Sequence, residues 1–428
     1  MPSAPDGGSV VIVGAGIIGL SVALRLQMDG MDVTVIDARE PMSGCSSGNA
    51  GYLSEANIFP PAAWDMLRRL PGLLFSRAGA LAVRPSYLPR LMPWAIRALR
   101  VSAAGTAGHI QRSMAGLLTE AIAAFDELLD AAGARHLVDR NGSLLVYQTA
   151  AALSAKARLL PGWNALGVRA EAVTARTMRA MEPALTPDMA GGICFPNAGR
   201  CLDPRALGLL YFDRFLRGGG TFVSGQVTEI IPGSDQVAAR LSGGRDVRAS
   251  RLVACTGFEP GPLQALLPFR LPLASERGYH LMLPHPGVRL SRPVVFGEPL
   301  FAATTMVEGL RLAGTAEFAC AKSPAAMAHA HRLLPLARKF LPHLDGNDAV
   351  PWMGVRPSLP DGMPAIGVLV SHPRILYAVG HAHNGLTTSA ITARCISAVI
   401  AGRATPIDLI PFAIERFTRR PAASRPSS

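Results

Sequence analysis

The feature that most constrains the fold of this chain is a glycine-rich turn between a short apolar strand and a helix. Residues 10–13 are apolar, Gly14, Gly16 and Gly19 follow directly, and residues 20–27 predict a helix. A second predicted strand over residues 32–36 ends at Asp37, about 20 residues further on. A strand, a Gly-x-Gly-x-x-Gly turn, a helix and an acidic residue in this order are typical of a dinucleotide-binding β–α–β unit.

Each residue of this unit has a chemical role in binding a dinucleotide. Gly14 permits the tight turn, Gly16 lets the backbone approach a pyrophosphate, and Gly19 allows the helix to pack closely on the strand. The free N–H groups at the helix N-terminus favour the phosphates. Asp37 accepts hydrogen bonds from a ribose diol. Its charge disfavours NADP, because it repels a 2′-phosphate and Arg39 does not replace it.

Two later segments predict that the chain returns to the same crevice. Residues 252–257 form an apolar strand that ends in a small-residue turn, and residues 380–387 precede the last predicted helix. Three chain segments that converge on one long ligand suit FAD better than NAD. An NAD-dependent dehydrogenase remains the alternative.

The length of 428 residues predicts two domains. Strand–helix units of the parallel type lie at both ends, and mostly antiparallel strands lie around residues 270–320. We therefore expect an α/β chain, α+β overall, with a Rossmann-type FAD-binding domain and an inserted, mostly antiparallel β-sheet substrate domain. The expected FAD-binding segments are 1–85, 150–270 and 350–428, and the expected substrate-domain segments are 86–149 and 271–349. Residues 221–231 predict one strand, and residues 325–340 predict one helix.

Composition narrows the class of protein further. The formal net charge is +12, but the chain is 49% hydrophobic and has no runs of Lys and Arg, which argues against nucleic-acid binding. Its six cysteines form no C-x-x-C pair, which argues against a zinc site or a redox dithiol. Residues 1–9 lack the basic start of a signal peptide. We expect a cytoplasmic protein.

Four further segments carry a resemblance to a known family: Ser-Ser-Gly-Asn-Ala-Gly at 46–51, Ala-Cys-Thr-Gly at 254–257, Trp-Met-Gly-Val-Arg-Pro-Ser-Leu-Pro-Asp-Gly at 352–362, and Gly-His-Ala-His-Asn-Gly-Leu-Thr at 380–387. With the glycine turn, they make the chain resemble the D-amino-acid oxidase superfamily of FAD-dependent oxidoreductases over nearly its whole length. It looks similar to the bacterial D-amino-acid dehydrogenases, and Ser-Glu-Arg-Gly-Tyr-His at 275–280 resembles their D-hydroxyproline-type members.

The resemblance implies a reaction and catalytic candidates. In the family, the Cα hydrogen of an amino acid moves as hydride to flavin N5. Arg356, in the Gly-x-Arg-Pro motif, is expected to bind the substrate carboxylate, which suits a planar, always charged, bidentate partner. Tyr279, His280 and His383 are further catalytic candidates, although strand packing accounts for Tyr279 and His280 equally well.

The resemblance also implies a set of FAD-binding residues. The N-terminal N–H groups of the last helix are expected to face the flavin pyrimidine ring. One of His381 and His383 is expected to be structural, and their spacing is a poor metal signature, so no metal is expected. Cys45 is expected to be an inert thiol. The expected cofactor-binding residues are Gly14, Gly16, Gly19, Asp37, Ala38, Arg39, Ser47, Asn49, Ala50, Gly51, Val227, Thr256, Gly257, Gly380, His381, Gly385, Leu386 and Thr387.

Partners and acceptor remain open at this point. Residues 62–104 are apolar and carry seven arginines against one acid. Such a segment suits either contact with the inner face of a membrane or a helical flap over the substrate domain. Membrane contact would suit an enzyme that passes electrons to a quinone or another respiratory-chain acceptor. The leading hypothesis is oxidative deamination of a small D-amino acid of the proline or hydroxyproline type. A glycine- or sarcosine-type amine oxidase and a flavin-binding relay subunit of a larger complex are the alternatives.

Overall fold

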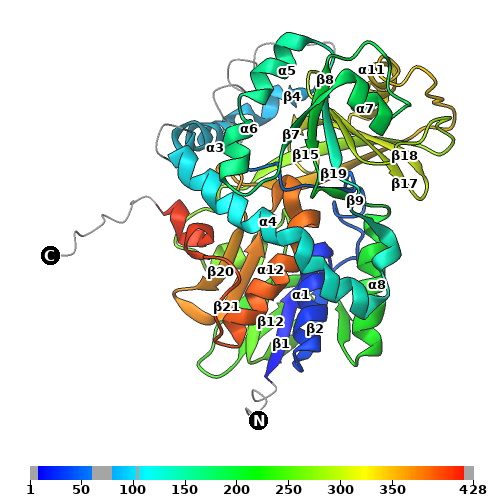
Figure 1. The fold of residues 1–428 in the computed structure, drawn as a ribbon. Helices are drawn as coiled ribbons and strands as arrows, with labels where there is room; N and C mark the ends of the chain where they lie inside the picture. The colour runs from blue at the N-terminus through cyan, green and yellow to red at the C-terminus, as the bar shows by residue number, and fades with distance from the viewer. Residues whose placement is uncertain (1–7, 60–79, 103–105, 419–428) are drawn as a thin grey trace.

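A six-stranded sheet carries the glycine turn at its centre (Figure 1). The computed structural model describes residues 8–59, 80–102 and 106–418. Five strands are parallel, and the edge strand β20 runs antiparallel to its neighbour. The strands follow the order β10 (Thr221–Ser224), β2 (Asp32–Asp37), β1 (Ser9–Val13), β14 (Arg251–Ala254), β21 (His372–Val379) and β20 (Ala365–Leu369).

The two faces of this sheet are covered by different layers. Val10 and Ile12 point into a core shared with the helices, whereas Val11 and Val13 point into a core shared with a three-stranded sheet, as the alternation of side chains along a strand requires. The helices are α1 (Ile17–Met28), α12 (Gly385–Ile400), α4 (Thr106–Ala132) and α8 (Pro204–Arg217), and the small sheet consists of β11 (Val227–Ile231), β12 (Val237–Leu241) and β13 (Asp246–Ala249).

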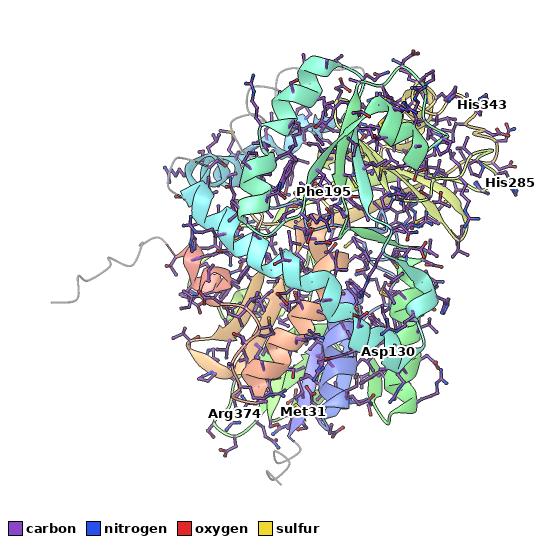
Figure 2. All side chains as sticks on the ribbon, in the orientation of Figure 1. Met31, Asp130, Phe195, His285, His343 and Arg374 are labelled. Atoms are coloured by element: carbon purple, nitrogen blue, oxygen red, sulfur yellow. The ribbon has the colours of Figure 1, made fainter. Side chains whose placement is uncertain are left out.

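A nine-stranded, mostly antiparallel sheet forms the other half of the molecule (Figure 1). Figure 2 shows Phe195 inside this half, His285 and His343 at its outer edge, and Met31 and Arg374 at the opposite end of the molecule. The strands are β19 (Val350–Ser358), β15 (Ala274–Leu283), β18 (Gly309–Phe318), β17 (Phe301–Met306), β16 (Val294–Phe296), β6 (Ser143–Tyr147), β8 (Gly191–Phe195) and β7 (Glu171–Thr174), and β4 (Leu81–Val83) pairs with β18.

Short elements complete the fold. A small three-stranded sheet consists of β3 (Tyr52–Leu53), β9 (Gly199–Cys201) and β5 (Val138–Asp139), and β9 lies where the two halves of the molecule meet (Figure 1). The other α-helices of the described residues are α3 (Leu88–Val101), α5 (Ala150–Ala157), α6 (Leu160–Ala165), α7 (Ala175–Met181), α9 (Gly261–Ala265), α10 (Ala328–His331) and α11 (Leu333–Ala337). In the described part of the chain, no helix is long and apolar enough to cross a membrane.

The predicted fold class is confirmed, but two predicted elements are wrong. Residues 221–231 form two strands in different sheets, because the chain turns at Gly225, whose N–H donates to the carbonyl of Asp37 at 2.9 Å. Residues 325–340 contain the two short helices α10 and α11 instead of one. Pro335 explains the break, since its ring would clash with the carbonyl of residue 331 in a continuous helix.

The strand pairings also divide the chain differently from the expected segments. Within 150–270, β7 and β8 pair in the nine-stranded sheet, as does β19 within 350–428. Within 86–149, α4 packs on α12 and α1 beside the six-stranded sheet. We therefore propose a substrate domain that includes β7, β8 and β19, and an FAD-binding domain that includes α4.

Candidate active site

The glycine turn at the carboxyl end of β1 has the geometry that a pyrophosphate requires. Gly14 has a φ of +112°, in the region that favours glycine. A Cβ at Gly19 would lie 1.9 Å from the carbonyl oxygen of Gly14, so helix and turn touch. A Cβ at Gly16 would meet only the Ser46 hydroxyl, at 3.5 Å. Gly16 makes no side-chain cap, and the N–H of Ile17, the first helical amide, donates to Ser46. The positive end of the α1 dipole still favours an anion at this turn.

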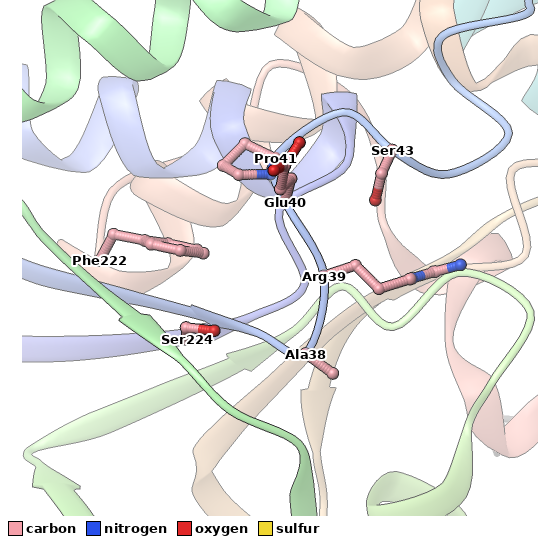
Figure 3. A pocket seen from close by; sticks show the side chains of 7 residues that line it. All are labelled: Ala38, Arg39, Glu40, Pro41, Ser43, Phe222 and Ser224. Atoms are coloured by element: carbon pink, nitrogen blue, oxygen red, sulfur yellow. The ribbon is translucent and has the colours of Figure 1, made fainter.

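Asp37 ends β2 beside this turn. Its carboxylate accepts hydrogen bonds from the N–H groups of Ala15, at 2.8 Å, and Arg39, at 2.9 Å. A surface hollow opens directly beyond the strand (Figure 3), and it is lined by Ala38, Arg39, Glu40, Pro41, Ser43, Phe222 and Ser224. Val227 is buried at the start of β11, in the segment that passes the end of β2. This mixture of one aromatic ring and several polar groups fits a nucleoside.

The turn after β14 meets the glycine turn from the other side. A Cβ at Gly14 would lie 2.3 Å from the carbonyl oxygen of Cys255. The next hydroxyl, Oγ1 of Thr256, is buried and has no hydrogen-bond partner among the described residues. Gly257 has a φ of +59° and open space where a Cβ would stand. An orphaned buried hydroxyl beside an open glycine fits a polar ligand group, because unpaired buried polar atoms are otherwise costly.

The predicted flavin loop at residues 46–51 is held between the two halves of the molecule. Ser46 accepts a hydrogen bond from the N–H of Ile17 at 3.3 Å, while the nine-stranded sheet reaches the loop through His280, whose Nδ1 donates to the Gly48 carbonyl at 3.0 Å. Ser47 and Asn49 turn their side chains onto the loop itself, toward Gly44 and Gly51. Ala50 lies between these contacts. These contacts fix the loop's backbone from both halves of the molecule.

The segment before α12 separates the two histidines. His381 is buried, its Nε2 lies 3.2 Å from the Thr392 hydroxyl, and burial lowers its pKa to about 3. It is therefore a neutral, structural residue. His383, in the short helix η3 (Ala382–Asn384), is 49% exposed and directs Nε2 toward Glu276. Neither side chain of the pair lies within a group of His, Cys, Asp or Glu placed to hold a metal ion in the described ranges.

The first turn of α12 has no side-chain cap at its N-terminal end. Gly380 precedes it with a φ of +77°, and Gly385, Leu386 and Thr387 form the turn itself. The Thr387 hydroxyl bonds back to the carbonyl of Tyr52 at 3.5 Å. A second helix N-terminus without a side-chain cap therefore lies close to the loop at residues 46–51.

Arg356 on β19 belongs to a charged cluster centred on Glu276 of β15. Its Nη1 donates to Oε1 of Glu276 at 3.1 Å. Glu276 also contacts Nε2 of His383 through Oε1, at 2.7 Å, and accepts a hydrogen bond from Ser358 at 2.6 Å. Burial alone would raise the pKa of Glu276, but these three groups outweigh burial and hold it well below its usual range. Glu276 is therefore an ionised, buried carboxylate.

Two of the predicted catalytic residues lie away from this cluster. Tyr279 is on the opposite face of β15, where its hydroxyl donates to Glu317 at 2.6 Å and accepts from the N–H of Ala326. His280 faces the cluster's side but is buried, stacks on Trp352 and has a pKa lowered to about 3, chiefly by burial. Both side chains therefore pack within the protein in this structure, and the Tyr279 hydroxyl points away from the cluster at Arg356.

Sequence reasoning missed Glu276 and Trp352. Glu276 becomes a site residue only through the pairing of β15 with β19, which sets it directly opposite Arg356. The ring of Trp352 occupies the space that a Cβ at Gly48 would need, at 2.3 Å. The one available signal was the presence of an acid in the Ser-Glu-Arg-Gly-Tyr-His segment. Near Arg356, the thiol of Cys45 has a raised pKa, mainly because of desolvation.

Comparison with known proteins decides the family. The family described as FAD dependent oxidoreductase matches residues 9–399. The chain belongs to this family. The predicted cofactor, FAD, is thereby established, as is the predicted class of enzyme, an FAD-dependent oxidoreductase. The glycine turn, the orphaned Thr256 hydroxyl and the hollow after β2 all fit such a cofactor.

Individual relatives agree with this assignment. The chain is 31% identical over 425 residues to a D-amino-acid oxidase of Bradyrhizobium diazoefficiens, covering 96% of this chain and 100% of the relative. It is 28% identical to D-amino acid dehydrogenase 2 of Ralstonia nicotianae, covering 95% and 100%. Glycine oxidase from Geobacillus kaustophilus has the same fold, with a TM-score of 0.73 at 20% identity and coverage of 97% and 100%. L-proline dehydrogenase from P. horikoshii shares it with a TM-score of 0.71 at 15% identity, covering 97% and 99%.

Proposed function

We propose that this FAD-dependent oxidoreductase oxidises the Cα–N bond of a small amino acid by hydride transfer from Cα. The observation that carries the proposal is Arg356, whose guanidinium is joined through Glu276 to His383, in the short helix that precedes α12. Only Nη1 of its guanidinium is used by a described residue, in the bond to Glu276. The remaining donors suit a substrate carboxylate, which arginine binds in a bidentate manner.

The cofactor would be held along the crevice at the carboxyl ends of the parallel strands. Gly14, Gly16 and the first turn of α1 would bind the pyrophosphate, and Asp37 the ribose. The hollow lined by Ala38 and Arg39 would take the adenosine end, with Val227, Thr256 and Gly257 along its length. The loop at residues 47–51 and the first turn of α12, with Gly380 and His381 behind it, would hold the isoalloxazine end.

The chemistry divides between cofactor and chain. FAD, when bound, accepts the substrate's Cα hydrogen with its electron pair at N5. The first turn of α12 would offer backbone N–H groups to the pyrimidine side, which carries negative charge once the cofactor is reduced. Arg356 orients the substrate by its carboxylate. The imine product hydrolyses to a keto acid and ammonia, or stays cyclic when the amine is part of a ring.

For the substrate we propose a small D-amino acid, including the proline and hydroxyproline type. The names of the relatives support the D-configuration, and the charged pair Arg356–Glu276 supports an amino acid. The name of glycine oxidase, which shares the fold, supports a glycine- or sarcosine-type amine oxidase as an alternative. A flavin-binding relay subunit of a heteromeric dehydrogenase is the other alternative. A relay subunit has no need of a carboxylate anchor.

We also propose that electrons pass to a quinone or another membrane acceptor while helix α3 rests on an anionic membrane surface. Within the described part of residues 62–104, α3 exposes an apolar stripe of Leu88, Met92, Ile96 and Leu99, between 42% and 51% exposed, and it carries Arg90, Arg97 and Arg100. Apolar anchors flanked by arginines suit the interface of an anionic membrane. Residues 62–79, with Arg68, Arg69 and Arg77, and residues 103–104 lie outside the described residues.

Steady-state assays with a panel of amino acids test this proposal. Purified protein would be supplied with D-proline, cis-4-hydroxy-D-proline, D-alanine, glycine and sarcosine, first with oxygen and then with a soluble quinone as acceptor. The proposal predicts turnover with a D-amino acid and faster reoxidation by the quinone. Turnover of glycine and sarcosine with oxygen alone would favour the oxidase, and flavin binding without any turnover would favour the relay subunit.

A further inference from the structure

The charged cluster at Arg356 contains more than a carboxylate anchor. Strands β15 and β19 run antiparallel, and Glu276 stands directly opposite Arg356 in their register. Because side chains alternate along a strand, Glu276, Gly278 and His280 share one face of β15. His280 contacts the loop at Gly48 on that face. Glu276 therefore points into the same space as Arg356.

The three side chains of the cluster differ in how far they reach solvent. Glu276 is 7% exposed, Arg356 is 25% exposed and His383 is 49% exposed. Oε1 of Glu276 contacts both Arg356 and His383, and Oε2 accepts from Ser358. A small molecule seated on the guanidinium would thus have Glu276 and His383 beside it.

The charges in this space suit a zwitterion. A buried carboxylate next to the arginine would weaken the binding of a simple carboxylate ligand, because it competes for the guanidinium and is costly to desolvate. It becomes favourable when the ligand also carries a cation that the carboxylate can accept hydrogen bonds from. An amino acid has such a cation on the carbon next to its carboxylate.

We infer that Glu276, with His383 beside it, forms an amine-binding subsite that accepts N–H bonds from the substrate while Arg356 binds its carboxylate. This inference rests on the proposed function and deepens it. Glu276 would thereby select amino acids over carboxylic acids that have the same shape but lack the amine. A secondary amine in a ring, which still has two N–H bonds when protonated, meets the requirement as well as a primary amine does.

The test compares a substrate with its analogue that has carbon in place of the amine nitrogen, in holoenzyme of the wild type and of Glu276→Gln. For D-proline the analogue is cyclopentanecarboxylate. The dissociation constant of D-proline would come from the concentration dependence of anaerobic flavin reduction, and that of the analogue from calorimetry. Glu120→Gln, an exposed glutamate on α4, is the matched control and should change neither constant.

The inference predicts effects of opposite sign. In Glu276→Gln, D-proline should bind about 10- to 100-fold more weakly, the effect of losing a charged hydrogen bond. Cyclopentanecarboxylate should bind as well or more tightly, because Arg356 loses its competitor. If both ligands weaken in parallel, Glu276 only positions Arg356 and the inference is overturned.

A second variant keeps the test decisive if Glu276→Gln loses its flavin. His383→Ala leaves Glu276 in place and should reduce the preference for D-proline over the analogue several-fold, whereas an unchanged preference would overturn the role of His383 and the subsite with it. Failure of the proposed function looks different, since then no amino acid would reduce the flavin of the wild type.

Discussion

Replacing Gly278 by alanine should displace the substrate anchor without removing a charge. A Cβ at Gly278 would lie 2.1 Å from Nη2 and 2.3 Å from Cζ of Arg356. An ordinary contact needs about 3.5–4.0 Å, so the guanidinium must move by about 1.5 Å. Arg356 is the flexible end of a long side chain, and it can make that shift while the fold stays intact.

The magnitude follows from the interaction that is lost. A charge-assisted pair between guanidinium and carboxylate contributes about 1.5–3 kcal/mol, which corresponds to about a 10- to 150-fold change in binding. We therefore expect the Kd for the amino acid in anaerobic flavin reduction to rise by roughly that factor in Gly278→Ala, with a melting temperature and an FAD content close to wild type.

The control for this variant is Gly116→Ala on α4. A Cβ there would have nothing within 4 Å, and alanine suits a helix interior better than glycine. Gly116→Ala should bind substrate normally and be slightly more stable. A folded, flavin-loaded Gly278→Ala protein with an unchanged Kd would refute the argument that Arg356 binds the carboxylate.

Three further predictions concern the cofactor, the fold and the membrane. Gly19→Ala should lose FAD, because its Cβ would lie 1.9 Å from the backbone oxygen of Gly14. Visible absorbance measures the flavin content, with Gly162→Ala as the control, and a full flavin content in Gly19→Ala would contradict the prediction. Tyr279→Phe should lower the free energy of unfolding by about 1.5–3 kcal/mol, since Glu317 loses a hydrogen bond, and should leave the Kd for substrate unchanged. Denaturant unfolding measures the first effect and flavin reduction the second; a raised Kd at unchanged stability would indicate that Tyr279 contacts the substrate. Met92→Ser with Ile96→Ser on α3 should reduce co-sedimentation with anionic vesicles, whereas the matched exposed pair Val370→Ser with Ile410→Ser should not; equal losses would argue against a membrane role for α3.

The parts that the sequence predicts well depend on neighbours close in the chain. The strand, the glycine turn, the helix and Asp37 lie within one stretch of residues, so local spacing identifies them and their roles. Arg356 was found in the same way, through a short motif. The single strand predicted over residues 221–231 is wrong because the chain turns at Gly225, where the backbone N–H bonds to Asp37. Asp37 is distant in the sequence, so local spacing does not reveal this turn.

The parts that it predicts poorly depend on strand register. Glu276 and Arg356 lie 80 positions apart, and only the pairing of β15 with β19 sets them opposite each other. The pairing of β15 with β18 sets Arg277 opposite Glu317, and Tyr279, two residues along the same face of β15, bonds to Glu317 as well. The sequence likewise does not show which of His381 and His383 is structural, because this depends on which side chain is buried against α12.

The most direct test of the account is anaerobic reduction of the protein-bound flavin by an amino acid. The purified holoprotein would be mixed with D-proline or D-alanine without oxygen, and the loss of visible flavin absorbance would be followed in wild type and in Arg356→Ala. The account predicts rapid, complete reduction of the wild type and a strongly raised Kd in the variant. A wild-type flavin that no amino acid reduces, or an Arg356→Ala protein reduced with wild-type affinity, would contradict it.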